Sequence, residues 1–288
     1  MTREDLLEKY GNGTYLPVLD HGHVTLVDVM GDDERVEQVA RLSYQKGTRK
    51  VSETRGLLRY LFRHRHTSPF EQAVITLDMK MPVFVARQLV RHRTQSLNEL
   101  SGRYSELPEE FYVPDRAQIC YQATDNKQGR SGPLPEDEAW QLQKQLHEEA
   151  EESFASYHQF LEAGVSRETA RINLPLSTYT QWCTTMNLHN LLHMLTLRLD
   201  PHAQWECRQY AEAIAKIVKD WVPIAWEAFE DYRLHGEEFS RQEMMVIRTI
   251  LGSEHLRNAV LLTSQGPDWS ERERKEFLAK LGISETVS

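Results

Sequence analysis

The 288-residue sequence has little cysteine and no long hydrophobic run. Its three cysteines, Cys120, Cys183 and Cys207, are odd in number and show no CxxC spacing. This pattern argues against a disulfide framework and for reduced thiols. No apolar run approaches the ~18 residues of a membrane span, and the N-terminal residues carry charges where a signal peptide needs an apolar stretch. We therefore expect a soluble cytoplasmic protein with no membrane partner.

Positive charge is also scarce, because 34 Lys and Arg residues face 43 Asp and Glu residues, for a net charge of −9. A chain this acidic is a poor general binder of nucleic acid, so any anion site must come from a local basic cluster. The P-loop, GxGxxG, GxSxG and HExxH motifs are all absent from the sequence. A nucleotide site would therefore need something other than a glycine-rich cradle.

The apolar pattern predicts an α+β fold. Alternation indicates strands over His23–Met30 and Ile75–Met81, although Val27 and Val29 blur the first of them. The remaining patterns are mostly helical and show no βαβ alternation, which disfavours a doubly wound sheet. At 40% apolar residues, a chain of this length can bury a core in one large domain or two small ones.

Helical spacing is found along most of the chain. In the first part of the chain, helices are expected over residues 33–44, after an N-terminal cap at Ser52, and over residues 83–93. Further along, helices are expected over residues 139–161, ending at Gly164, and over residues 188–199. A last long helix is expected from Pro201 to Pro223, which ends or kinks it. Four tryptophans, including Trp182, fall at helical positions and are expected to pack in the core. Residues 124–135 are expected to form a surface loop. Beyond Gly236, two or three short amphipathic helices are expected, separated at Gly252 and at Gly266-Pro267.

The segment Arg91–Arg103, RHRTQSLNELSGR, has an unusual composition. Three consecutive basic residues would spread over about 200° of a helix, so they cannot share one solvated face. By themselves they would fit a helix end, where cations complement the helix dipole. The next residues add hydroxyls, an amide, the carboxylate of Glu99 and another guanidinium, and Gly102 permits close approach of the backbone. Arginines and hydroxyls suit phosphate, whereas the carboxylate suits a sugar hydroxyl or a ring N–H.

This segment matches the pattern RHR-x2-S-x-N-E-x-S-x-R of the flavin-dependent thymidylate synthases at every fixed position. Eight specified residues match by chance on the order of 10⁻¹⁰ per start site, at roughly one in twenty each. The resemblance spans residues 21–232 and includes FEQAVITLDMKMPVFVARQLVRHR, RETARINLPLSTYTQW and LTLRLDPHAQWECRQYA. It implies a single domain over residues 1–236, with a small, mainly antiparallel sheet flanked by long helices, and a helical extension over 237–288.

The resemblance also implies an activity and its ligands. Similar enzymes methylate deoxyuridylate (dUMP) to thymidylate, with 5,10-methylenetetrahydrofolate as carbon donor and with FAD reduced by NADPH as hydride donor. They are homotetramers whose active sites are shared between subunits. The cysteine-dependent thymidylate synthases instead attack uracil with a thiolate in a Pro-Cys motif, and no cysteine here lies in one. Packing is expected for all three thiols.

Residue roles are carried over by position. The resemblance assigns to FAD the residues Ser68, Arg91, His92, Arg93, Glu99, Asn187, Leu188, His189 and His193. It assigns to dUMP the residues Gln88, Leu89, Val90, Arg91, Glu99, Leu100, Ser101, Gly102, Arg103, Arg171 and Arg198. Arg198 is expected beside the uracil ring and His66 beside the flavin on the folate side, as the catalytic pair.

Alternative interpretations remain for several of these residues. Without the resemblance, Arg171 and Arg198 would be ordinary helix arginines, and His66 a solvated histidine at a helix end. His189 and His193 are spaced i, i+4 but have no carboxylate or cysteine at ligand spacing, so no metal is expected. Two other functions are possible. The first is a nucleic-acid-binding module, which Glu99 and the net charge disfavour. The second is another flavoenzyme such as a flavin reductase, in which the residues assigned to dUMP would have no role.

Overall fold

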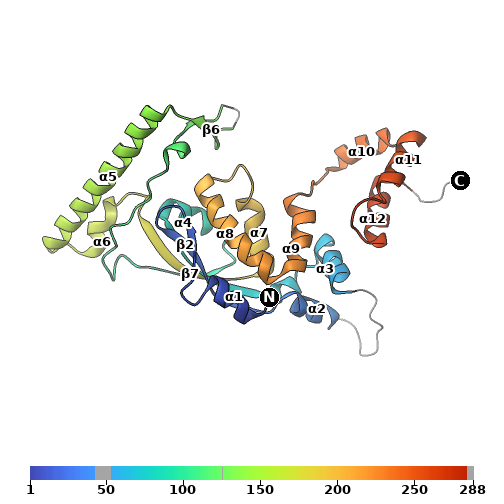
Figure 1. Ribbon diagram of the computed structural model, residues 1–288, viewed down its shortest axis with the longest axis horizontal. Helices are drawn as coiled ribbons and strands as arrows, with labels where there is room; N and C mark the ends of the chain where they lie inside the picture. Colours follow the sequence, from blue (N-terminus) through green and yellow to red (C-terminus); the bar gives the residue numbers. More distant parts are fainter. Residues whose placement is uncertain (43–52, 125, 284–288) are drawn as a thin grey trace. The chain divides into compact units, whose positions relative to one another are not determined.

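The computed structural model describes residues 1–42, 53–124 and 126–283. The chain forms two compact units, Met1–Leu234 and His235–Ser288 (Figure 1). The first unit is built on a five-stranded antiparallel sheet in the order β1-β2-β3-β7-β4. The strands are β1 (Leu16–Val18), β2 (Gly22–Met30), β3 (Val74–Pro82), β7 (Tyr179–Asn187) and β4 (Ser96–Glu99). The α+β class and the antiparallel sheet are confirmed.

The blurred alternation of β2 is explained by a bulge in its pairing with β3. The register shifts between Leu26 and Asp28. Val27 is consequently 46% exposed, whereas Val29 is 6% exposed and returns to the core side. An extra residue in one strand reverses the facing of the residues after it, which is why two valines two positions apart lie in different environments.

Strand β7 and strand β4 were not predicted from the sequence. On β7, Thr180 and Thr184 face the buried side together with Trp182, so polar and apolar residues do not alternate along the strand. Trp182 was expected on a helix but lies on this strand, opposite Met79 and Glu99. Both neighbours of β7 come from distant parts of the sequence, so no local pattern marks it as the strand that joins them.

Helices of the first unit cover the apolar face of the sheet and extend beyond it. They are α1 (Arg3–Tyr10), α2 (Asp33–Arg41), α3 (Thr54–Arg63), α4 (Val83–Leu89), α5 (Glu136–Glu162), α6 (Arg167–Ala170), α7 (Leu188–Arg198), α8 (Trp205–Trp221) and α9 (Pro223–Phe229). The sheet-covering helix α8 buries Cys207, Tyr210, Ile214, Ile217, Val218 and Trp221. In Figure 1, α5 stands away from the sheet, where it packs on α6 through a small separate cluster around Phe154 and Tyr157.

Several predicted helix limits need correction. The helix expected over 83–93 ends at Leu89, so Arg91, His92 and Arg93 lie beyond it. The helix expected from Pro201 begins at Trp205, because the Asp200 carboxylate accepts a hydrogen bond from the His202 N–H (2.7 Å) and closes a turn there. The cap predicted at Ser52 and the end of the helix predicted over 33–44 lie outside the described residues.

The expected loop over 124–135 is partly a strand. β6 (Arg130–Pro133) pairs with β5 (Cys120–Gln122) in a two-stranded hairpin. The stop at Gly164, with φ of 81°, and the break at Pro223 between α8 and α9 agree with prediction.

The second unit contains the three expected helices, α10 (Arg241–Ile250), α11 (Glu254–Thr263) and α12 (Glu271–Leu281). Ser240 and Ser270 begin α10 and α12 with reciprocal capping boxes. Across both units, none of the described helices is both long and apolar enough to span a membrane.

Candidate functional site

The segment Arg91–Arg103 joins the end of α4 to the outer strand of the sheet. Its first residues follow the C-cap Val90, and residues 96–99 form β4, paired with Thr185 to Trp182 of β7. Gln95 holds the connection, because its amide donates to the Leu89 carbonyl (3.1 Å) and accepts from the Thr184 hydroxyl (2.7 Å). The basic residues Arg91 and Arg93 are exposed on the isolated chain.

Arg198, the last residue of α7, reaches back to this segment. Its Nε donates to His92 Nε2 (3.0 Å) and its Nη2 donates to the Gln88 carbonyl (3.0 Å). Two nitrogen atoms of the rigid guanidinium, Nε and Nη2, therefore fix the position of the Arg198 side chain, and neither bond involves Nη1. Residues 88, 92 and 198, all predicted for the site, are brought together by these two hydrogen bonds from the end of α7.

His92 must be neutral to take part in this contact. An Nε2 atom that accepts a hydrogen bond carries no proton, so the ring proton sits on Nδ1. Burial, the charge of Arg198 and the neighbouring His193 lower the pKa of His92 to about 4. The imidazole is therefore an uncharged support for the Arg198 guanidinium at neutral pH.

Several other residues assigned to dUMP lie at or just after the end of β4. Glu99 accepts from the Thr180 hydroxyl (2.7 Å), and the Leu100 N–H donates to the Gln181 carbonyl (2.8 Å). A Cβ atom at position 102 would lie 3.0 Å from side-chain atoms of Leu107 and 3.1 Å from Cδ of Arg171, so a larger residue there would have to displace these side chains slightly. Arg103 is exposed and pairs with Glu168 of α6 (3.1 Å).

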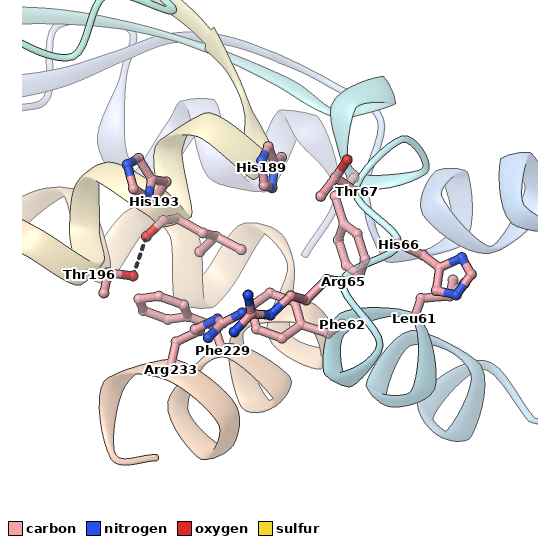
Figure 2. Close-up of a pocket in the computed structure, with 12 residues that line it drawn as sticks. Leu61, Phe62, Arg65, His66, Thr67, His189, His193, Thr196, Phe229 and Arg233 are labelled. Atoms are coloured by element: carbon pink, nitrogen blue, oxygen red, sulfur yellow. Dashed lines mark hydrogen bonds between the residues drawn. The ribbon is translucent and has the colours of Figure 1, made fainter. Parts of the chain in front are cut away.

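A cavity of about 270 Å³ lies on the other side of α7 (Figure 2). Its apolar wall includes Phe62, Phe70 and Phe229, with Phe62 contacting the other two rings edge-on. Figure 2 shows His189 and His193 projecting from one helix of the cavity and His66 standing across from them. An apolar slot with a few polar groups is typical of a site for a planar heteroaromatic ring.

The cavity and the basic segment are connected through two histidines. The rings of His92 and His193 meet edge-to-face with centroids 6.4 Å apart. His193 also lines the cavity, so one residue of α7 faces both parts of the site. This contact places His193 next to the Arg198 cluster, and His66 and His189 line the same cavity as His193.

Some of the other residues predicted for the site cap a helix or pack in the core. Asn187 caps α7 by accepting from the Asn190 N–H (2.9 Å), and the side chains of Leu188 and Leu89 are buried in the core. Ser68 does not line the cavity, whereas its neighbour Thr67 does. The ligand contacts proposed for Ser68, Asn187, Leu188 and Leu89 stay predictions.

The cavity also contains residues that the sequence did not single out. They are Arg65, Thr67, Thr196 and Arg233, besides the aromatic wall. Arg65 lies between the two histidines of RHRH, so its position beside His66 was a usable signal. No local signal exists for Arg233, which follows the last matched residue of the resemblance.

Two of the three cysteines are poor nucleophiles where they lie. Burial raises the pKa of Cys207 to about 11, and burial also raises the pKa of Cys183 on β7. The Cys120 thiol is on the hairpin strand β5, where it contacts the Ala117 carbonyl. None of the three lines the cavity described above. Among the described residues, no group of three or more His, Cys, Asp or Glu is placed to hold a metal.

Comparison with known proteins identifies relatives over most of the chain. The family model described as thymidylate synthase complementing protein matches residues 25–224. A flavin-dependent thymidylate synthase of Rickettsia conorii is 44% identical and the match covers 93% of each chain. One of Thermus thermophilus is 52% identical over 83% of this chain and 87% of its own. The match to the Rickettsia protein is long enough to extend into the C-terminal unit.

A solved structure of similar fold comes from Streptomyces cacaoi. It is a crystal structure of a UMP/dUMP methylase bound with 5-Br UMP, with a TM-score of 0.70 and 34% sequence identity. The match covers 76% of this chain and 98% of that one. A second structure of the same methylase, with 5-Br dUMP, matches with a TM-score of 0.68.

Proposed function

Since this chain belongs to the thymidylate synthase complementing protein family, whose relatives are flavin-dependent thymidylate synthases, we propose that it catalyses the complete reductive methylation of dUMP. The substrates are dUMP, 5,10-methylenetetrahydrofolate, NADPH and a proton. The products are thymidylate, tetrahydrofolate and NADP⁺, so the reaction balances in atoms and electrons. The observation that carries this proposal is the Arg198–His92–Gln88 cluster, in which Arg198 of α7 and Gln88 of α4 meet His92 of the fully matched segment beside a ring-sized cavity.

The residues around the cavity fit a flavin. The edge-on phenylalanine rings suit a flat, largely apolar ring, and His189 and His193 offer polar contacts at its border. When bound as FAD, the cofactor supplies the hydride that converts the transferred one-carbon unit into a methyl group. Arg91 and Arg93 would hold its phosphates, because guanidinium forks match phosphate oxygens.

The protein's own contribution is positioning and charge. Arg198 is half-buried and fixed by two hydrogen bonds, so its charge is preorganised before the substrate arrives. Placed beside the uracil ring, it stabilises negative charge that develops on the pyrimidine. Ser101, Gly102, Arg103 and Arg171 form the phosphate end of the same site. With the buried Cys207 thiol near pKa 11, no thiolate attack on the ring is proposed.

We further propose a homotetramer with active sites shared between subunits. Arg91, Arg93 and Arg103 are exposed on the single chain, and a site for two anionic ligands needs them enclosed. Helix α5 offers apolar surface for such contacts, since Trp140, Leu142, Leu146 and Phe160 are each more than 40% exposed. Light scattering is expected to give four times the 33.6 kDa chain mass, and an active monomer would contradict the shared site.

Product analysis tests the activity. The purified protein should contain flavin and should form thymidylate and tetrahydrofolate in equal amounts when given the three substrates. A variant with all three cysteines replaced by alanine should retain turnover. Loss of activity in a folded, flavin-loaded triple variant would mean that a thiolate takes part, and a protein that oxidises NADPH without methylating dUMP would be a flavin reductase instead.

A further inference from the structure

Two threonines of β7 lie on the buried face of the sheet, where apolar side chains are expected. Thr180 is 6% exposed and Thr184 is 1% exposed, and both share this face with Trp182. A buried hydroxyl lowers stability unless it forms a hydrogen bond. Each of the two hydroxyls forms one, and both partners lie in the segment Arg91–Arg103. The inward-facing threonines therefore connect the sheet to residues of the proposed site.

Thr184 fixes the side chain of Gln95. A backbone carbonyl can only accept, so the amide nitrogen of Gln95 faces the Leu89 carbonyl (3.1 Å) and its oxygen faces the Thr184 hydroxyl (2.7 Å). The Leu89 carbonyl also accepts from the His92 N–H (3.1 Å). Gln95 and His92 thus bond to the same oxygen atom at the end of α4. The bond from Gln95 closes the loop of residues 90–94, which contains the three consecutive basic residues of the segment.

The closed loop determines where the ring of His92 lies. This ring accepts from Arg198 Nε (3.0 Å), and together with the Gln88 carbonyl it holds the guanidinium. Groups that stabilise a developing charge must keep their place to within about 0.5 Å, which requires that their supports are themselves fixed. The contacts from Thr184 and Gln95 continue through His92 to this guanidinium.

Thr180 has the corresponding role at the other end of β4. Its hydroxyl donates to Glu99 Oε1 (2.7 Å), and Glu99 lies opposite Trp182 in the pairing of β4 with β7. A carboxylate accepts at both oxygens, so this bond orients the group without using Oε2. Thr180 therefore orients the one acidic residue among those assigned to FAD and dUMP.

We propose that Thr180 and Thr184 are positioning residues of the reaction. Through Gln95, Thr184 holds the loop of residues 90–94, and Thr180 holds the Glu99 carboxylate. Neither threonine is assigned to a ligand, and Gln95 occupies a position that the matched pattern leaves free. This inference rests on the proposed function. It also gives a reason for the polar side chains on the buried face of β7.

Paired substitutions separate the effect of the hydroxyl from that of side-chain size. Valine keeps the size of threonine and suits a strand, whereas serine keeps the hydroxyl. Thr184→Val should lower the rate of flavin oxidation at saturating substrates about tenfold, as expected for one lost hydrogen bond. Thr180→Val should weaken dUMP binding, measured by calorimetry, by about the same factor. Thr184→Ser and Thr180→Ser should restore most of each loss.

Thr185→Val is the matched control. Thr185 belongs to the same strand, but its hydroxyl bonds to that of Thr76 on β3 (2.9 Å). Its loss should leave flavin oxidation and dUMP affinity unchanged, whatever it does to the melting temperature. If Thr184→Val does not fold, Gln95→Ala removes the same contact from a half-buried position and should slow flavin oxidation in the same way.

A second measurement does not depend on activity. In Thr184→Val the loop of residues 90–94 is no longer held by β7, so the ring of His92 becomes more accessible to water. NMR titration should then show the pKa of His92 rising from about 4 towards its ordinary value of 6.5. The control Thr185→Val should leave this pKa unchanged.

Wild-type kinetics, dUMP affinity and His92 titration in the folded valine variants would refute the inference. Equal defects in Thr185→Val, or serine variants as impaired as the valine variants, would also refute it, because the effects would then reflect stability or packing. A wild-type protein that binds dUMP but forms no thymidylate would refute the proposed function itself. An active wild type with unaffected valine variants would refute this inference alone.

Discussion

Arg198 and Arg103 both belong to the predicted dUMP set, but the structure holds them differently. Arg198 is half-buried and bonded to His92 and Gln88, whereas Arg103 is 58% exposed and paired only with the exposed Glu168. An exposed pair of this kind is worth at most about 1 kcal/mol, so Arg103 is easily released to a phosphate. A cation in a fixed position, such as Arg198, can stabilise charge that develops during the reaction, whereas a mobile cation, such as Arg103, can bind the substrate phosphate as it arrives.

This difference predicts distinct kinetic defects. Arg103→Ala should weaken dUMP binding by about one to two decades, the loss of a charge-assisted contact, while saturated turnover stays close to wild type. Arg198→Ala and Arg198→Lys should slow flavin oxidation by saturating substrates, and lysine should not rescue fully because its ammonium group cannot reproduce the planar fork of the guanidinium. Single-turnover stopped flow and dUMP titrations measure the two effects.

Glu168→Gln provides the matched control for Arg103. It removes the ion pair and keeps the arginine, so dUMP affinity should be unchanged or higher. A wild-type saturated rate for Arg198→Ala, with only a raised dUMP requirement, would make Arg198 a binding residue.

The neutral state of His92 predicts a pH dependence. Its pKa in the folded protein, about 4, lies below the ordinary value of 6.5. The neutral ring therefore contributes stability that is fully present above pH 6.5 and is lost as the pH falls towards 4. After burial, the charge of Arg198 is the next cause of this shift, so Arg198→Gln should raise the pKa of His92. NMR titration of the imidazole ring measures the pKa of His92. As a control, Arg103→Ala should leave this pKa unchanged.

At the scale of secondary-structure elements, Asp33 connects two helices. This residue begins α2, and its buried carboxylate accepts hydrogen bonds from the N–H groups of Ile224 (2.7 Å) and Ala225 (2.9 Å) at the start of α9. Pro223 precedes them at the first helical position, where no donor is needed. The side chain thus caps a helix almost two hundred residues away and fixes α9 next to α2.

Burial raises the pKa of Asp33 to about 6 despite these two donors. A raised pKa means that the folded state binds the proton more tightly, so this group costs stability as the pH rises from about 4 to about 6. The cost amounts to on the order of 3 kcal/mol. Relative to Asp33→Asn, the wild type should therefore become less stable across this window, as measured by urea unfolding at several pH values. A constant difference would mean that Asp33 has an ordinary pKa.

At the scale of the whole molecule, the proposed site and the C-terminal unit occupy different parts of the sequence. Every predicted site residue lies in Met1–Leu234. In the unit from His235 onward, Leu278 is 1% exposed and the rings of Trp269 and Phe277 are in contact. Its apolar residues Met245, Val246 and Ile250 are more than half exposed, so we expect them to cover another surface of the protein, away from the chemistry.

Truncation after Gly236 tests this division. The shortened protein should retain flavin and turnover per folded molecule but should melt at a lower temperature, since apolar surface is then left uncovered. Thermal unfolding and single-turnover rates on the same preparation separate the two effects. If turnover disappears while flavin content and melting temperature are unchanged, the C-terminal unit has a catalytic role.

The sequence by itself determined the features that depend on neighbouring residues. Helical spacing predicted α5, α7 and the three C-terminal helices, and Gly164 and Pro223 marked stops because φ and the missing N–H act locally. The segment Arg91–Arg103 was recognisable for the same reason, since its eight fixed residues lie within one short stretch. A phosphate-binding role for this segment could be predicted without knowing that part of it is a β-strand.

Only the tertiary structure decided what depends on residues far apart in the chain. β7 has inward-facing threonines and gains its place by pairing with β3 and β4. The contact between Arg198 and His92 spans 106 positions, and it acts together with burial to keep the histidine neutral. Arg65 and Arg233 meet at one cavity because a left-handed residue and a π-helical turn redirect them. Side-chain direction at such points depends on packing between elements, which no local spacing encodes.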